Sequence, residues 1–269
     1  MKRMIYQVCL GKAKDSKLYK HCMDSVHTYC LANDIEHRVQ TYPILRIKPD
    51  VFATNRSKDS YMKHGGFLPI YEKENAFDFC GDYDQIAIVD ADIYIKPDAP
   101  NIFDDFGTED PFGAVVEMDM PINAKYMAKI KNYSHMQYQS LAGKMNSSKW
   151  RYETATGFEF MNMGLILLNC EKFSEHLKGK SAKEFLNQAQ FKDFIDGIGP
   201  WKWSTDQTLL NYWLRKHEIP FKRMDWKWNA LYSALTAGKV QEAHFVHFFL
   251  KDLLPEKGEN VEELMNLIK

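Results

Sequence analysis

The hydrophobic and polar positions of this chain repeat in two ways, with a period of two in some segments and a helical period in others. Apolar or alternating stretches predict strands at residues 4–10, 35–42, 85–89, 112–118, 158–169 and 240–250. Apolar positions at helical spacing predict helices at 16–31, 67–79, 173–177, 182–194, 205–216 and 261–268, and residues 101–106 form a short helix or a turn. Strands and helices that alternate along a chain are typical of an α/β protein. We therefore expect a single α/β domain over residues 1–269.

Two segments interrupt this alternation. Residues 43–66 are irregular and basic, and residues 121–156 mix six cations with five aromatic side chains. We interpret residues 121–156 as a partly helical insertion over the sheet. A solvated helical hairpin is the alternative interpretation of the same pattern.

Composition narrows the class of protein. A net charge of −1 gives no support for nucleic acid as the main partner, because binding to nucleic acid usually needs a basic face. No apolar run approaches the roughly 20 residues of a transmembrane helix, and the apolar stretch at the start is too short for a signal peptide. The five cysteines are scattered without metal-binding spacing, so we expect them to be reduced and the protein to be cytoplasmic. The oligomeric state stays open.

The strongest chemical signal is the sequence Asp90-Ala91-Asp92, directly after the predicted strand 85–89. Two carboxylates at the end of a buried strand repel each other and are costly to remove from water. A divalent cation removes that penalty, and oxygen ligands suit magnesium, manganese or calcium. Ligands of open α/β sheets also gather at the carboxyl ends of strands. The sequence therefore predicts a metal site here.

Three later segments carry further candidates. Asn162 and Gly164 interrupt the apolar strand 158–169, and a β-bulge at Gly164 is an alternative that leaves Asn162 unexplained. Asp206 and Gln207 fall in the first turn of the helix 205–216, where an acid also complements the helix dipole without any function.

The third segment, residues 243–251, contains two histidines and a lysine. His244 and His247 are three residues apart, so on a strand they point to opposite faces and only one can join the carboxylates. We favour His247, because Lys251 follows it and the pair suits a metal-bound diphosphate. A histidine packed in the core is the alternative.

Taken in order, these segments resemble the GT-A nucleotide-sugar glycosyltransferases, and most closely glycosyltransferase family 8. Residues 87–92 are similar to the family's V-L-Y-L-D-A-D strand, and residues 206–211 to its D-Q-x-x-h-N helix. Residues 160–169 are similar to F-N-x-G-h-h-h-h-N with one inserted methionine. Residues 246–251 are a degraded version of h-H-F-x-G-x-x-K, without the glycine.

The resemblance implies a single GT-A domain with a mixed, mostly parallel central sheet flanked by helices, and residues 121–156 on the acceptor side. It also implies a manganese (or magnesium) ion and a UDP-sugar donor, with a carbohydrate, lipid-linked or protein acceptor. Nucleotide-sugar contacts would come from Gln7, Cys9, Gly11, Lys63, Asp90, Ala91, Asn162, Gly164 and Lys251. The metal ligands would be Asp90, Asp92 and His247, and the catalytic residues Asp206 and Gln207.

Family 8 enzymes retain the anomeric configuration, which implies that Gln207 or a backbone oxygen faces the sugar. An inverting enzyme would instead use Asp206 as a general base. Two other functions remain open: a haloacid-dehalogenase-type phosphohydrolase, which also uses Asp-x-Asp at a strand end, and a non-catalytic nucleotide-sugar-binding protein.

Overall fold

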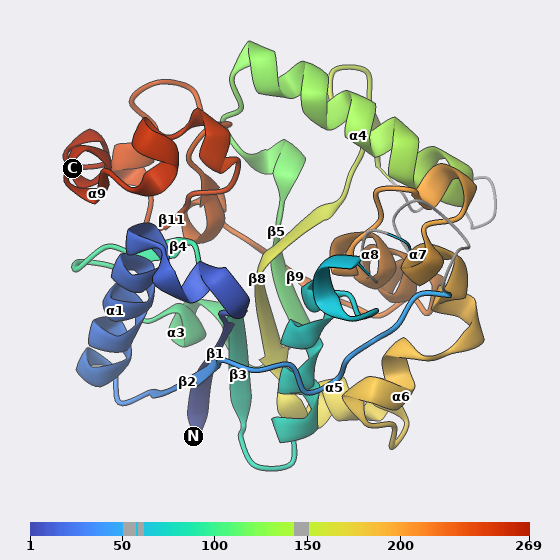
Figure 1. Cartoon of the computed structure of the whole chain (residues 1–269). Helices are drawn as coiled ribbons and strands as arrows, with labels where there is room; N and C mark the ends of the chain where they lie inside the picture. The colour runs from blue at the N-terminus through green and yellow to red at the C-terminus, as the bar shows by residue number, and fades with distance from the viewer. Residues whose placement is uncertain (51–57, 59–61, 143–150) are drawn as a thin grey trace.

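The computed structural model describes residues 1–50, 58, 62–142 and 151–269, and its centre is a six-stranded sheet in the order β2–β1–β3–β8–β5–β9 (Figure 1). β8 runs antiparallel to both neighbours, and the other pairs are parallel. The predicted mixed, mostly parallel sheet is thus confirmed. Its strands are β1 (Arg3–Val8), β2 (Glu36–Gln40), β3 (Gln85–Val89), β5 (Phe112–Val116), β8 (Met161–Asn169) and β9 (Lys222–Met224).

Helices cover both faces of this sheet. Successive strand residues point to opposite faces, so Met4 and Tyr6 pack in one apolar cluster and Ile5 in the other. In Figure 1, α1, α3 and α9 lie on one side of the sheet and α5 to α8 on the other, with α4 above them. The helices are α1 (Lys17–Ala32), α3 (Ile102–Phe106), α4 (Ala124–Ala142), α5 (Cys170–Leu177), α6 (Ala182–Leu186), α7 (Lys192–Asp196), α8 (Asp206–Lys216) and α9 (Val261–Leu267).

Short elements complete the fold. A three-stranded sheet has the order β10–β11–β4, and β6 pairs with β7 in a hairpin. These strands are β4 (Ile93–Ile95), β6 (Tyr152–Glu153), β7 (Gly157–Phe158), β10 (Ala230–Leu231) and β11 (Phe245–His247). The 3-10 helices are η1 (Gly11–Asp15), η2 (Pro69–Phe79), η3 (Glu117–Asp119), η5 (Ala189–Phe191), η6 (Gly199–Trp201), η7 (Trp226–Asn229), η8 (Val240–Glu242), η9 (Lys251–Leu253) and η10 (Pro255–Gly258).

The central strand β8 contains an irregularity that matters for the site. Its pairing with β3 is regular, but its pairing with β5 is not. Gly113 of β5 pairs with residue 167 of β8, and Val115 pairs with residue 162, so two steps along β5 match five steps along β8. This bulge reverses the alternation of side chains, since Met163 packs in one apolar cluster and Leu165, two residues later, in the other. The β-bulge considered at Gly164 is therefore present in this stretch.

Most predicted elements are confirmed, and three differ in form. The predicted helix 182–194 is broken into α6, η5 and α7. The predicted strand 240–250 is strand only over β11, because η8 precedes it and Leu250 adopts a left-handed φ of 55°. The predicted helix 67–79 is a 3-10 helix, η2.

Buried Glu72 ties η2 to the irregular segment that begins at residue 43. Its carboxylate accepts hydrogen bonds from the consecutive backbone N–H groups of residues 44, 45 and 46, at 2.6, 3.0 and 2.6 Å. The side chain of Gln40 donates to the same carboxylate at 2.9 Å. A backbone without regular structure thus obtains its hydrogen bonds from one glutamate, which fixes η2 beside β1 and β2.

Two properties predicted from composition can be compared with the structure. The five cysteines are free and buried. Among the described residues, no helix combines the length and the apolar character needed to cross a bilayer.

Candidate active site

The turn that follows β3 carries the two predicted acids. The N–H of Asp90 donates to the carbonyl of Gly164 on β8 at 2.8 Å, and the Asp90 carbonyl accepts from Ile93 N–H at 3.1 Å. The Asp92 carbonyl accepts from Phe248 N–H at 2.9 Å, next to β11. The two carboxylates therefore lie where the main sheet meets the small sheet, and their side chains are 33% and 16% exposed.

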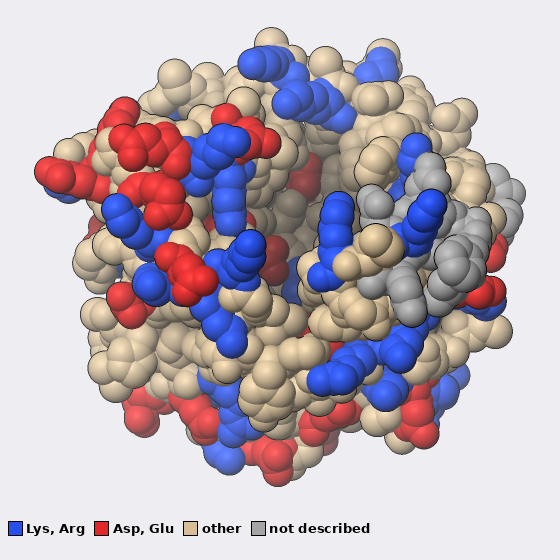
Figure 2. Space-filling view, in the orientation of Figure 1, with Lys and Arg blue, Asp and Glu red and all other residues tan. Residues whose placement is uncertain are grey.

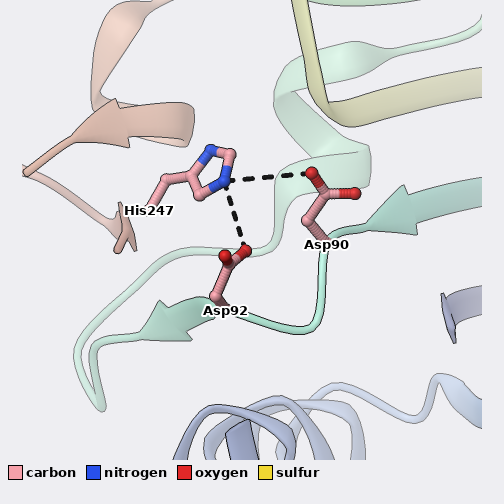
Figure 3. A group of neighbouring side chains, drawn as sticks. All are labelled: Asp90, Asp92 and His247. Carbon is pink, nitrogen blue, oxygen red and sulfur yellow. Dashed lines mark ion pairs between the residues drawn. The ribbon is translucent and has the colours of Figure 1, made fainter. Parts of the chain in front are cut away.

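His247 completes this cluster from the other end of the chain (Figure 3). Its Nε2 lies 3.2 Å from Asp92 Oδ1 and 3.8 Å from Asp90 Oδ2. Burial alone would lower the pKa of His247, but the charges of Asp92 and Asp90 reverse the shift and raise it. His244 points elsewhere and packs on Trp228 with ring centroids 4.7 Å apart. Of the two histidines, His247 is the one that lies beside the acids.

The cluster fits a divalent cation. Its three ligand atoms lie within 4.8 Å of one another. An octahedral cation with ligands at about 2.1 Å separates neighbouring ligand atoms by about 3 Å, which the observed spacing accommodates. Two carboxylates and one imidazole are suitable ligands for magnesium, manganese or another first-row ion. Asp90, Asp92 and His247 could therefore hold a metal together.

Lys73 of η2 links this cluster to α8. Its Nζ lies 3.1 Å from Asp90 Oδ1 and 2.9 Å from Asp206 Oδ2, and it donates to the carbonyl of Met163 at 2.5 Å. Burial would lower the pKa of Lys73, but Asp206 and Asp90 raise it well above its ordinary value, so the ammonium stays charged. The neighbouring Glu74 is fully buried, and burial raises its carboxyl pKa well above the usual range.

A cavity of about 240 Å³ opens beside the two acids. Its lining includes Cys9 and Ala91, two of the residues predicted to contact a nucleotide-sugar, and also Tyr19, Lys73 and Asp206. Figure 2 shows this face hollowed at its centre, with acidic atoms inside the hollow and cations around it. The carboxyl edge of β1 and β3 thus forms a depression next to the cluster, lined by both charged and apolar side chains.

The other residues expected to contact the nucleotide have varied positions. Gln7 is fully buried under the turn, where its Nε2 donates to the Asp90 carbonyl at 3.2 Å. Gly11 opens η1 at a φ of 58°, a conformation that glycine adopts without strain. Lys251 Nζ lies 3.4 Å above the ring centroid of Tyr19, a cavity-lining side chain. Lys63 is exposed.

A second cavity of about 340 Å³ lies under α4. Gln207 lines it, next to Asp206 of the first cavity, and the Gln207 Oε1 accepts from the N–H of Met163 at 3.3 Å. Most of its lining is apolar, with Tyr126 among the rings, and Glu117 supplies a carboxyl group. Burial raises the pKa of Glu117 to about 7, against the hydrogen bonds that Asn162 and Tyr126 donate to it.

Asn162 and Gly164 lie between the second cavity and the histidine. Asn162 lines that cavity and donates from Nδ2 to Glu117 Oε1 at 2.7 Å. A Cβ on Gly164 would lie 2.4 Å from Cε1 of His247, so the absence of a side chain makes room for the imidazole. The predicted sugar contacts of both residues stay predictions.

Sequence reasoning missed four residues around the site. Lys73 stands between two glutamates in a helical stretch, where a charged run normally marks a solvated face. Glu74 gave no signal for the same reason, and Asn229 follows Trp228 without any motif. Glu117 had a usable signal, because it directly follows β5 at a strand end near which ligands gather.

Comparison with known proteins supports the fold. No family model matches the sequence, and no curated protein does. Among solved structures, a glycosyltransferase involved in the glycosylation of the major capsid of PBCV-1 aligns over 98% of this chain and 100% of its own, with a TM-score of 0.54 and 12% identity. Mouse xyloside xylosyltransferase 1 aligns over 95% and 100%, with a TM-score of 0.50 and 14% identity. The chain therefore has the GT-A glycosyltransferase fold.

Proposed function

We propose that this chain is a metal-dependent glycosyltransferase that moves a sugar from a nucleotide-diphosphate sugar, a UDP-sugar in the first instance, to a carbohydrate, lipid-linked or protein acceptor. One observation carries the proposal: Asp90, Asp92 and His247 converge beside a cavity at the carboxyl edge of the sheet. The fold supports it, since α/β sheets bind ligands at that edge. For the metal we propose manganese over magnesium, because the imidazole favours a transition-metal ion.

The donor would lie in the first cavity. The nucleoside would occupy the part lined by Cys9 and Tyr19, and the diphosphate would face Asp90, Asp92 and the ammonium of Lys251. When bound, a divalent cation there neutralises the diphosphate and stabilises the charge that develops on the leaving group. The predicted contacts of Gln7 and Gly11 with the nucleotide, and of Lys63 with the phosphates, belong to the same hypothesis.

The transferred sugar would lie where the two cavities approach each other. Asp206 lines the first cavity and its neighbour Gln207 the second, so these two side chains can contact donor and acceptor together. Asp206 is paired with Lys73, which favours an orienting role over that of a free base. We therefore propose retention of configuration with Gln207 on the sugar face, and an acceptor under α4 in the 121–156 region.

The observations bear differently on the two alternative functions, a phosphohydrolase and a non-catalytic binding protein. The alignment of nearly the whole chain with glycosyltransferases gives no support to a phosphohydrolase. A non-catalytic nucleotide-sugar-binding protein would use the same residues around the donor, and only a turnover assay separates it from an enzyme. The cytoplasmic location stays a prediction, drawn from the free cysteines.

Calorimetric titration with UDP, GDP, CMP and ADP, each with and without manganese, tests the donor site. We expect one diphosphate to bind only with manganese, and the Asp92→Asn variant to lose this binding while keeping its fold. Asp252→Asn is the matched control, because Asp252 is 87% exposed and outside the cluster. If Asp92→Asn binds the nucleotide as the wild type does, the metal-site hypothesis is wrong.

Proton NMR of the anomeric product tests the stereochemistry once a donor is known. Retention predicts the same anomeric configuration in donor and product. An inverted product would instead assign general-base catalysis to this site and bring Asp206 back as the candidate base.

A further inference from the structure

A chain of hydrogen bonds runs from the second cavity to the metal cluster through two buried asparagines. Glu117 accepts from Nδ2 of Asn162 at 2.7 Å, and Oδ1 of Asn162 accepts from Nδ2 of Asn229 at 2.9 Å. Oδ1 of Asn229 then lies 3.0 Å from Nδ1 of His247. All four side chains are buried, and buried polar groups of this kind are normally hydrogen-bonded to one another.

One backbone N–H group fixes the direction of every hydrogen bond in this series. Gly164 N–H, which can only donate, points at Asn162 Oδ1 at 2.9 Å. The amide of Asn162 must therefore present its oxygen to that side and its NH2 to Glu117. Asn229 must in turn give its NH2 to the same oxygen, which leaves its own oxygen facing the imidazole. An acceptor at that position requires a proton on Nδ1 of His247.

We propose that Asn162 and Asn229 are positioning residues that hold a proton on Nδ1 of His247, so that Nε2 presents its lone pair to the cation beside Asp90 and Asp92. The proposal rests on the metal site of the proposed function. In this proposal the hydrogen bonds of the two asparagines determine which imidazole nitrogen is free to bind the metal, a role beyond packing. Fixing the tautomer and the ring orientation is how groups behind a ligand raise metal affinity.

Gly164 connects this series of hydrogen bonds to Asp90. Its N–H anchors Asn162, and its carbonyl accepts from the N–H of Asp90 at 2.8 Å. One residue of β8 therefore fixes both the imidazole and the turn that carries the acids.

The position of the proton can be read without metal. In the free chain Asp92 lies 3.2 Å from Nε2 and competes for a proton there, so the measurement uses the Asp92→Asn variant. Long-range 1H–15N NMR of histidine-labelled protein at pH 8 distinguishes the two neutral tautomers. We expect His247 to carry its proton on Nδ1, and the double variant Asp92→Asn with Asn162→Leu to shift toward Nε2–H. A proton on Nε2 in the single variant would overturn the proposal.

Metal binding provides the second readout. With Asp92 in place, we expect Asn162→Leu and Asn229→Leu to weaken manganese binding by about 10- to 100-fold in calorimetry. Asn169→Leu is the matched control, since Asn169 is a buried asparagine at the far end of the same strand, and its loss should lower stability without changing manganese affinity. Wild-type affinity in folded Asn162→Leu contradicts the proposal.

The two hypotheses fail separately. If the wild type binds no manganese, the metal site of the proposed function is wrong, and the NMR result still decides the tautomer. Circular dichroism of each variant establishes that it is folded, and Asn229→Leu replaces Asn162→Leu in the double variant if the latter does not fold.

Discussion

At the scale of single residues, Lys73 neutralises two acids that would otherwise repel each other in a poorly solvated place. Its side chain is 11% exposed and lies within 3.1 Å of both Asp90 and Asp206. Removing one member of a buried ion pair leaves the other charges uncompensated, which costs about 3 kcal/mol or more.

We therefore expect Lys73→Met to lower the free energy of unfolding by about 3 kcal/mol in urea denaturation. Manganese should restore part of that loss, because a bound cation replaces the missing charge beside Asp90. Lys216→Met, which removes an exposed lysine on α8, should change stability little. Equal stability of the wild type and Lys73→Met would show that the acids do not depend on this ammonium.

Glu117 makes stability depend on pH. Its pKa is about 7 in the folded chain and near 4.5 when exposed, so between these values the folded state binds more protons than the unfolded state. Stability then falls as pH rises from about 4.5 to about 7, by up to roughly 3 kcal/mol over these 2.5 units. In Glu117→Gln this contribution is absent, so the variant should gain stability relative to the wild type between pH 5 and pH 7.5. Parallel urea curves at both pH values would contradict the raised pKa.

At the scale of elements, one side chain joins α8 to β8. Asn211 accepts from the N–H of Met161 and donates to the Met161 carbonyl, each at 2.9 Å and both buried. Thr205 caps the same helix by accepting from the N–H of Gln207 at 3.2 Å. The helix that presents Asp206 and Gln207 is thus held to the strand that carries Asn162.

We expect Asn211→Ala to lower stability by about 2–4 kcal/mol, since it leaves a buried N–H and a buried carbonyl without partners. Asn266→Ala, at an exposed position of α9, should stay within about 0.5 kcal/mol of the wild type. Chemical denaturation of both variants checks this difference. A loss of stability in Asn211→Ala no larger than in the control would show that Asn211 does not stabilise the contact between α8 and β8.

The pattern predicted elements well where their apolar period was unbroken. The helix 205–216 has a Thr205 cap and one continuous apolar face, and it forms as predicted. The predicted helix 182–194 breaks because its buried positions change phase: Leu186 and Phe191 are five residues apart, and a continuous helix would turn Lys192 toward the core. The burial of apolar side chains on two differently oriented faces therefore outweighed the helix propensity of the segment.

At the scale of the whole molecule, the cluster of Asp90, Asp92 and His247 joins distant parts of the chain. Asp90 and His247 are 157 positions apart (247 − 90), and they meet because β11 pairs with β4. The order of several weak motifs, together with their resemblance to a known family, was enough to name these residues as candidate ligands. The positions of Lys73 and Asn229 were not predictable, because only tertiary packing brings them to the cluster.

A site assembled from such distant segments exists only in the folded state. We therefore expect manganese to raise the free energy of unfolding by about 2.7 kcal/mol at a concentration 100-fold above its dissociation constant. Asp92→Asn should show no such gain, whereas Asp252→Asn should keep it. Urea curves with and without manganese make the comparison, and equal gains in both variants would place the ion elsewhere.

The bulge in β8 sets a limit on changes of length. Because β8 covers five steps, from 162 to 167, where β5 covers two, the strand reaches the cluster with the parity that turns Asn162 and Gly164 toward His247. Losing or gaining one residue there would reverse that parity and present a methionine to the imidazole instead. Loops on the surface can lengthen or shorten over generations. In this strand, deletions and insertions of a single residue should be selected against, even where every ligand is kept.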